Sequence, residues 1–132
     1  MFEDIVVRLT DPRTQYQITN TFLRVAPNNL NGVEVILRKI SDMTYEVSLD
    51  GWHEPFWNYE EARKCFLSVL TGRFRIKRLR KGDFPFCWTL EHFAESQWRV
   101  VSTTRLLFYP FWRRTTVEYL QNEPLHDFSS TS

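Results

Sequence analysis

The sequence predicts an α+β fold, an antiparallel sheet of about five to seven strands with one or two helices packed on one face. Two observations carry this prediction: short β-rich runs follow one another through short turns, and a single stretch near the middle has a strong helical pattern. The length of 132 residues and a composition of 42% hydrophobic and 25% charged residues are typical of one globular domain. We expect that domain over residues 1–123, and a frayed polar tail over 124–132.

The first element is ambiguous between helix and strand. Asp11 followed by Pro12 is a favourable helix start, and Ile18, Phe22 and Val25 recur at helical spacing. The same stretch is rich in Thr, Ile, Val and Tyr, which favour strands. We expect a possible N-terminal helix within residues 12–26, with strand as the alternative.

A β-hairpin is predicted next. The runs GVEVILRKI and MTYEVSLD are separated only by Ser41 and Asp42, and Tyr45, Val47 and Leu49 alternate with polar neighbours. A turn is expected after this hairpin, over the residues DGWHEPFW. That turn leads into the clearest helix of the chain, at about residues 59–71.

The helix boundaries are set by local signals. Asn58 is a good N-cap with Glu61 three positions later, and Gly72 is a good terminator. Glu60 and Glu61 lie in the first turn, where carboxylates complement the helix dipole, so they require no catalytic explanation.

Strands are predicted over the remainder of the chain. They cover RFRIK, PFCWTLEHF and, after a short turn at 94–96, QWRVVST. RLLFY and TTVEYL are expected to pair as a hairpin closed by PFWR. A helix over residues 111–121 is the alternative, because Pro110 suits the first helical position.

Aromatic residues make up 16% of the chain, and four of them surround Pro110. Because a loop buries four rings only when another element covers them, they form either a folded-back corner or an exposed anchor for a partner. Our leading hypothesis is a non-catalytic domain that binds another protein, or a second copy of itself, through these rings. The residues assigned to this surface are Phe108, Tyr109, Phe111, Trp112, Phe56 and Trp57.

Basic residues are concentrated in one block. The net charge is only +1, yet residues 73–114 carry 10 basic and 3 acidic side chains. In a strand, Arg73, Arg75 and Lys77 share one face, and Arg80 follows near the turn. This ladder supports an alternative function, single-stranded nucleic-acid binding, with a solvated outer face as the simpler interpretation. A further alternative is a small-ligand site in an aromatic pocket between sheet and helix.

Catalytic and cofactor motifs are missing from the sequence. His53 and Glu54 do not start a zinc-binding HExxH motif, because Trp57 stands where the second histidine is required, and the role of His53 stays open. Four glycines do not build a phosphate-binding loop, and Cys65 and Cys87 form no CxxC pair. We therefore expect no metal, no cofactor and no enzymatic activity. With no secretory signal or membrane span in the sequence, we expect a cytoplasmic protein without a membrane partner.

Overall fold

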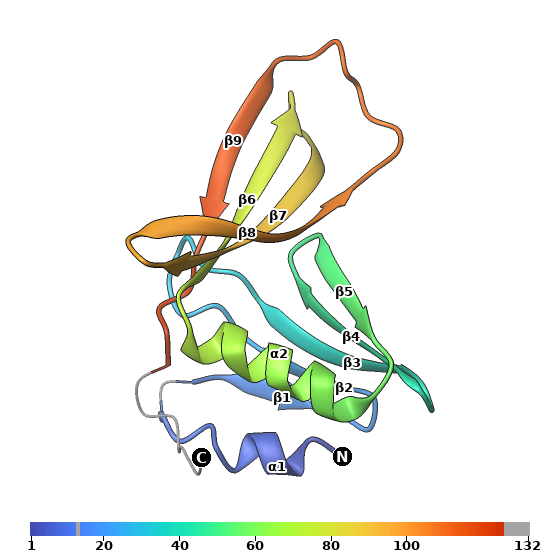
Figure 1. The fold of residues 1–132 in the computed structure, drawn as a ribbon, viewed down its shortest axis with the longest axis vertical. Coiled ribbons are helices and arrows are strands. Elements are labelled where there is room, and N and C mark those ends of the chain that lie inside the picture. Colours follow the sequence, from blue (N-terminus) through green and yellow to red (C-terminus); the bar gives the residue numbers. More distant parts are fainter. Residues whose placement is uncertain (13, 126–132) are drawn as a thin grey trace.

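Five antiparallel strands form a meander in the first part of the chain, here called the lower sheet (Figure 1). In the computed structural model, which describes residues 1–12 and 14–125, each strand pairs with its neighbours in sequence. Alternate side chains of the strands, including Leu23, Val35, Leu37 and Val47, are fully buried on one face. The strands are β1 (Tyr16–Ile18), β2 (Phe22–Val25), β3 (Val35–Ser41), β4 (Thr44–Leu49) and β5 (Trp52–Phe56).

Helix α2 (Tyr59–Thr71) packs on the buried face of the lower sheet (Figure 1). Its apolar positions, including Ala62 and Phe66, are fully buried, and the Asn58 side chain caps the helix by accepting a hydrogen bond from the Glu61 amide at 2.9 Å. The short helix α1 (Glu3–Val6) buries Ile5 in the same core. The predicted helix at 59–71 is confirmed.

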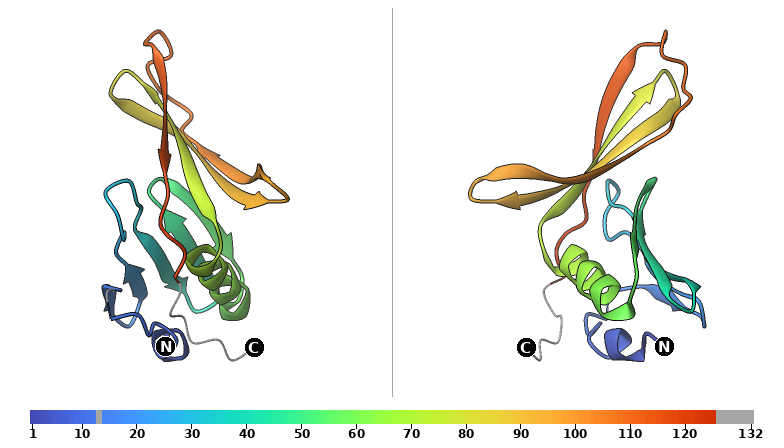
Figure 2. Two further views of the ribbon diagram at one scale, coloured as in Figure 1. Left: turned by 90° about the vertical axis from the view of Figure 1, so that its left-hand side faces the viewer. Right: turned by 45° about the vertical axis from the view of Figure 1, so that its right-hand side comes forward.

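Four strands form a second antiparallel sheet, here called the upper sheet. Its spatial order is β8-β7-β6-β9, and it projects from the lower sheet and helix α2 (Figure 2). The strands are β6 (Phe74–Lys81), β7 (Phe84–Ala94), β8 (Gln97–Arg105) and β9 (Thr115–Leu120).

The inner face of the upper sheet completes the core. Ile76, Trp88 and Leu90 join the cluster formed by the lower sheet and α2. The Trp52 indole of β5 donates to the Ser102 hydroxyl of β8 at 2.9 Å. Gly51 lies so close to the Trp88 ring that a Cβ atom there would collide with it.

The α+β class and the antiparallel pairing are confirmed, but the prediction of one sheet with five to seven strands is wrong: the described residues form two sheets of five and four strands. The described residues between 12 and 26 form β1 and β2 and none of them is helical, because β3 offers β2 a full ladder and the β-branched residues suit it. Residues 51–57 contain strand β5, where Pro55 is tolerated because β5 lies at the sheet edge.

The strand interpretation of residues 111–121 is confirmed by β9, but its expected hairpin partner is wrong. The expected partner RLLFY is not a strand beyond Arg105, where β8 ends. β9 pairs with β6 instead, because β7 fills the opposite edge of β6 and β9 takes the free one. The expected tail is described only in part. Leu125 donates its amide hydrogen to the Leu70 carbonyl at 3.0 Å and packs on the core, whereas residues 126–132, including His126, lie outside the described residues.

Candidate binding surfaces

The loop between β8 and β9 is anchored at its base. The Leu106 amide donates to the Phe86 carbonyl and the Gly82 amide donates to the Arg114 carbonyl, both at 2.9 Å. The Tyr109 ring stacks on buried Phe86, with 4.3 Å between ring centroids and 20° between planes. These contacts fix both ends of the loop to the β6–β7 hairpin.

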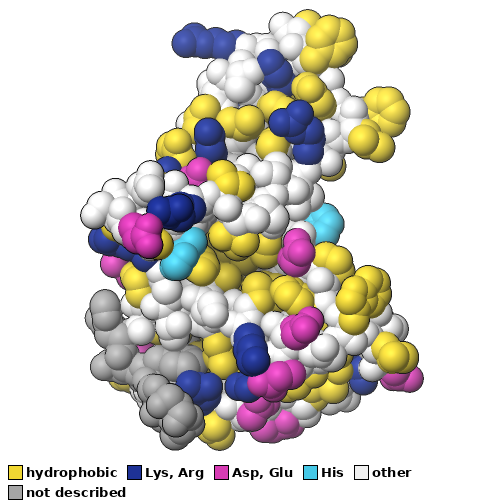
Figure 3. Space-filling model, in the orientation of Figure 1, with side chains coloured by type: hydrophobic (Ala, Val, Ile, Leu, Met, Phe, Trp, Pro, Cys, Tyr) yellow, Lys and Arg dark blue, Asp and Glu magenta, His cyan; other side chains and the backbone are white. Residues whose placement is uncertain are grey.

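Four large apolar side chains of this loop are strongly exposed to solvent. Their exposed fractions are 90% for Leu107, 88% for Phe108, and 72% for both Phe111 and Trp112. We call these four residues the apolar tip. Phe111 and Trp112 contact each other edge to face, with 5.4 Å between ring centroids. Hydrophobic side chains protrude at this end of the molecule in Figure 3. Apolar surface gathered and exposed in this way is characteristic of a binding site.

The structure separates the six residues assigned to the aromatic surface. Phe108, Phe111 and Trp112 are exposed on the β8–β9 loop, where Phe111 and Trp112 contact each other, and Tyr109 anchors the same loop on Phe86. Phe56 packs against the core from β5, and Trp57 is exposed beside the start of α2. Because the loop lies at the outer end of the upper sheet, Phe56 and Trp57 do not extend the tip (Figure 1).

Four cations near the apolar tip are not among the site residues predicted from the sequence. Arg105 precedes the loop, Arg113 and Arg114 follow its turn, and Lys81 ends the neighbouring strand β6. Within the described part of the chain, none of them has an ion-pair partner. All four lie within the basic block at residues 73–114, which is the signal in the sequence that points to them.

The predicted basic ladder is partly neutralised. Arg75 donates to the Glu91 carboxylate at 2.6 Å, and its guanidinium lies 4.1 Å from the ring centroids of both Trp98 and Tyr119. Arg73 lies over the Phe93 ring at 4.9 Å. Arg75 is therefore held between two aromatic rings and a carboxylate. Of the four ladder residues, only Lys77 has neither an ion-pair partner nor a ring partner within residues 1–12 and 14–125.

Arg80 lies on the other face of β6 from Arg75 and Lys77. Strand alternation places it beside Arg78, and both arginines pair with Glu118 of β9. The hydrogen bond from Arg78 lowers the pKa of the Glu118 carboxyl below its usual range. Arg78 also contacts Asp50 at 2.9 Å, which connects the two sheets.

In both histidine–carboxylate neighbour pairs, the two side chains lie on opposite faces of their strand. His53 is exposed on one face of β5, while Glu54 lies on the opposite, partly buried face. Glu91 pairs with Arg75, whereas the His92 ring packs against Phe74 at 4.4 Å. Among the described residues, no three His, Cys, Asp or Glu side chains gather as metal ligands would.

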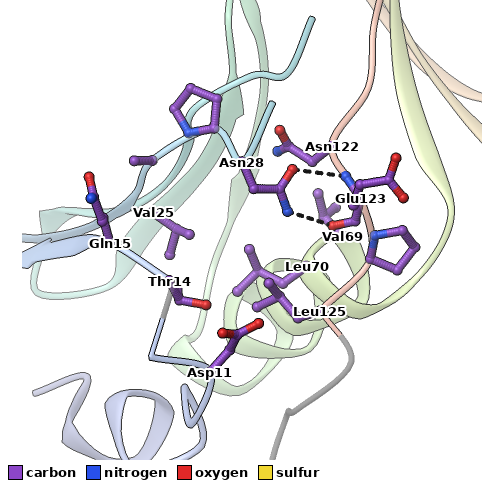
Figure 4. Close-up of a pocket in the computed structure, with 13 residues that line it drawn as sticks. Asp11, Thr14, Gln15, Val25, Asn28, Val69, Leu70, Asn122, Glu123 and Leu125 are labelled. Atoms are coloured by element: carbon purple, nitrogen blue, oxygen red, sulfur yellow. Dashed lines mark hydrogen bonds between the residues drawn. The ribbon is translucent and has the colours of Figure 1, made fainter. Parts of the chain in front are cut away.

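A cavity of about 450 Å³ lies between the loop after β2 and the segment after β9 (Figure 4). Val25, Val69, Leu70 and Leu125 are apolar lining residues. At its rim, the Asn28 side chain donates to the Glu123 carbonyl at 2.8 Å and accepts from the Glu123 amide at 2.9 Å. None of the described residues that line this cavity is aromatic, so these residues do not form the aromatic pocket proposed from the sequence.

Neither helix of the described residues has the length and hydropathy required to cross a bilayer. Comparison of the chain with protein-family models, with curated proteins and with solved structures gives no match.

Proposed function

We propose that this protein is a non-catalytic binding module that docks onto another protein through the apolar tip. The observation that carries the proposal is the exposure of Leu107, Phe108, Phe111 and Trp112, each at least 72% exposed, on a loop whose base is fixed. Water contact with such surface is unfavourable and is removed when a partner covers it. The fixed base also lowers the entropy that the loop loses on binding.

The side chains around the tip resemble the composition of binding hot spots. Trp112 provides a large exposed ring, Arg113 and Arg114 follow it directly in the chain, and Arg105 ends the strand that precedes the loop. An apolar centre bordered by cations fits a partner with an apolar pocket and an acidic rim. Tip-to-tip pairing of two copies is less favourable, because it brings like charges together.

The proposal is tested by placing a photo-crosslinking phenylalanine analogue at position 112 in the native cells. Position 43 is the matched control, because Met43 is also strongly exposed but lies in the β3–β4 turn of the lower sheet. We expect one discrete protein adduct from position 112, loss of this adduct in Phe111→Ser, and none from position 43. The purified adduct partner must then bind the isolated protein.

Equal adduct patterns at the two positions, or none at either, would contradict docking through the tip. Light scattering of the purified protein separates self-association from a heterologous partner: a dimer that Trp112→Ser converts to monomer assigns the tip to a second copy. Absence of catalysis, of cofactors and of a membrane partner, and a cytoplasmic location, stay predictions.

A further inference from the structure

The upper sheet separates charge between its two faces. Inner-facing Arg78 and Arg80 are matched by Asp50 and Glu118. The outer face, turned away from the lower sheet, has Glu91 as its one carboxylate among the described strand residues. Strand alternation and the ring contacts place five cations on the outer face: Arg73, Arg75, Lys77, Lys81 and Arg105. Lys and Arg side chains gather over the upper sheet in Figure 3.

Most of this outer positive charge has no counter-charge. Glu91 is only 8% exposed and is already paired with Arg75. Within the described chain, Lys77, Lys81 and Arg105 make no ion pair, and Arg73 has only its contact with the Phe93 ring. The outer face therefore attracts anions. The attraction follows a line, because Arg73, Lys77 and Lys81 succeed one another along β6 and the residue just before it.

A flat ring lies beside this line of charge. One row across the four strands contains Thr103, Thr89, Lys77 and Tyr119, which are register partners in that order. The Tyr119 ring is 47% exposed, and Arg75 supports it at 4.1 Å from the ring centroid. A cation directly beside a supported, half-open ring provides one contact for a phosphate and one for a base.

We infer that the outer face of the upper sheet binds single-stranded nucleic acid. The phosphates lie along Arg73, Lys77, Lys81 and Arg105, and a base stacks on Tyr119. Single strands fit better than duplexes, because the bases of a duplex have no free flat face to offer to Tyr119. The four residues of the apolar tip take no part in this site, although Lys81 and Arg105 lie near both surfaces, so the inference does not rest on the proposed protein docking.

The test is fluorescence anisotropy of a labelled oligouridylate of about 12 nucleotides, titrated with the whole protein. Four phosphate contacts on a single strand predict a slope of about −3 for log K against log salt, and therefore about fiftyfold weaker binding at 200 mM than at 50 mM salt. Lys77→Glu should weaken binding about tenfold or more. Tyr119→Leu should weaken it about fivefold or more through lost stacking.

Two variants serve as controls. Lys64→Glu makes the same charge reversal at an exposed position of α2 and should change the affinity less than twofold, as should Phe111→Ser in the tip. No binding at 50 mM salt, or equal losses in Lys64→Glu and Lys77→Glu, would overturn the inference. If Tyr119→Leu binds normally and inorganic polyphosphate competes as well as oligouridylate, the face is a general polyanion surface and the nucleic-acid assignment is refuted.

Discussion

Replacing Asp50 tests how the two sheets are held together. Asp50 lies in the β4–β5 turn with a positive φ of 56°, and its carboxylate accepts hydrogen bonds from the Trp88 indole at 2.7 Å and from Arg78 at 2.9 Å. In Asp50→Ala the Trp88 N–H, on a side chain only 8% exposed, loses its partner. An unsatisfied buried donor costs about 1–3 kcal/mol, and the left-handed backbone costs alanine about 1 kcal/mol more.

The expected loss for Asp50→Ala is therefore about 2–4 kcal/mol of unfolding free energy, a large part of the stability of a small domain. Asp50→Asn is the matched control. Asparagine tolerates the left-handed conformation, and its amide oxygen still accepts from Trp88. The control should lose about 1 kcal/mol or less, because Arg78 keeps its second partner, Glu118.

Urea unfolding, followed by tryptophan fluorescence and by far-ultraviolet circular dichroism, measures both variants. Coincident transitions from the two probes are required for the free energies to be comparable. Equal stability of Asp50→Ala and Asp50→Asn would refute the reasoning, because it would show that the indole–carboxylate bond does not hold the upper sheet in place.

Three further predictions follow from other contacts. The Asn122 side chain accepts a hydrogen bond from the Val33 amide at 2.9 Å and donates one to the Val33 carbonyl at 2.6 Å. Asn122→Ala removes both bonds and should lower the free energy of unfolding in urea by about 1–3 kcal/mol. A loss below about 0.5 kcal/mol would contradict a stabilising role for this pair of bonds. Because the Arg78 hydrogen bond lowers the folded-state pKa of Glu118, this group stabilises the fold above its unfolded pKa of about 4.3 and loses that effect as pH falls through the folded value. Glu118→Gln should therefore lose less stability than the parent protein between about pH 6 and 3, and parallel curves would exclude this role. Burial raises the pKa of the Cys65 thiol to about 12, so in a Cys87→Ala background iodoacetamide should alkylate Cys65 far more slowly at pH 8 than after unfolding in urea, and equal rates would contradict it.

Helix α2 and the central hairpin were predictable because their signals are local. The Asn58 cap, the apolar positions 62, 66, 69 and 70, and Gly72 all lie within a stretch of fifteen residues, and the helix begins and ends where they place it. Strand β4 likewise alternates strictly, and its buried Val47 is the register partner of buried Leu37 in β3. Such elements require no knowledge of the rest of the chain.

The incorrect predictions concern elements whose structure depends on distant partners. Ile18 and Phe22 fit a helical spacing and a strand about equally, and only the ladder with β3 decides between them. The pairing of β9 has the same character, because Val117 and Tyr119 would alternate equally well beside β8 or β6. Loop connections between strands do not reveal which edge of a sheet is free.

Which cations lack an ion-pair partner could not be predicted from the sequence, for a related reason. The sequence shows a basic block, but which cations are neutralised depends on where Glu91, Asp50 and Glu118 are placed by other strands and turns. Arg75 and Lys77 differ by two positions in one strand, yet one is enclosed by two rings and a carboxylate and the other has no counter-charge among the described residues.

The two proposed surfaces differ in their physical basis, and this difference makes them separable. Binding at the apolar tip depends on burying Phe111 and Trp112, and salts such as sulfate strengthen the burial of apolar surface. Binding at the outer face depends on Lys77 and its neighbours, and salt weakens it through counterion release. A partner whose affinity rises in sulfate belongs to the tip. A partner that dissociates as steeply as counterion release requires, beyond the screening of an acidic rim at Arg113 and Arg114, belongs to the outer face. The salt response of one purified complex therefore assigns its surface before any variant is made.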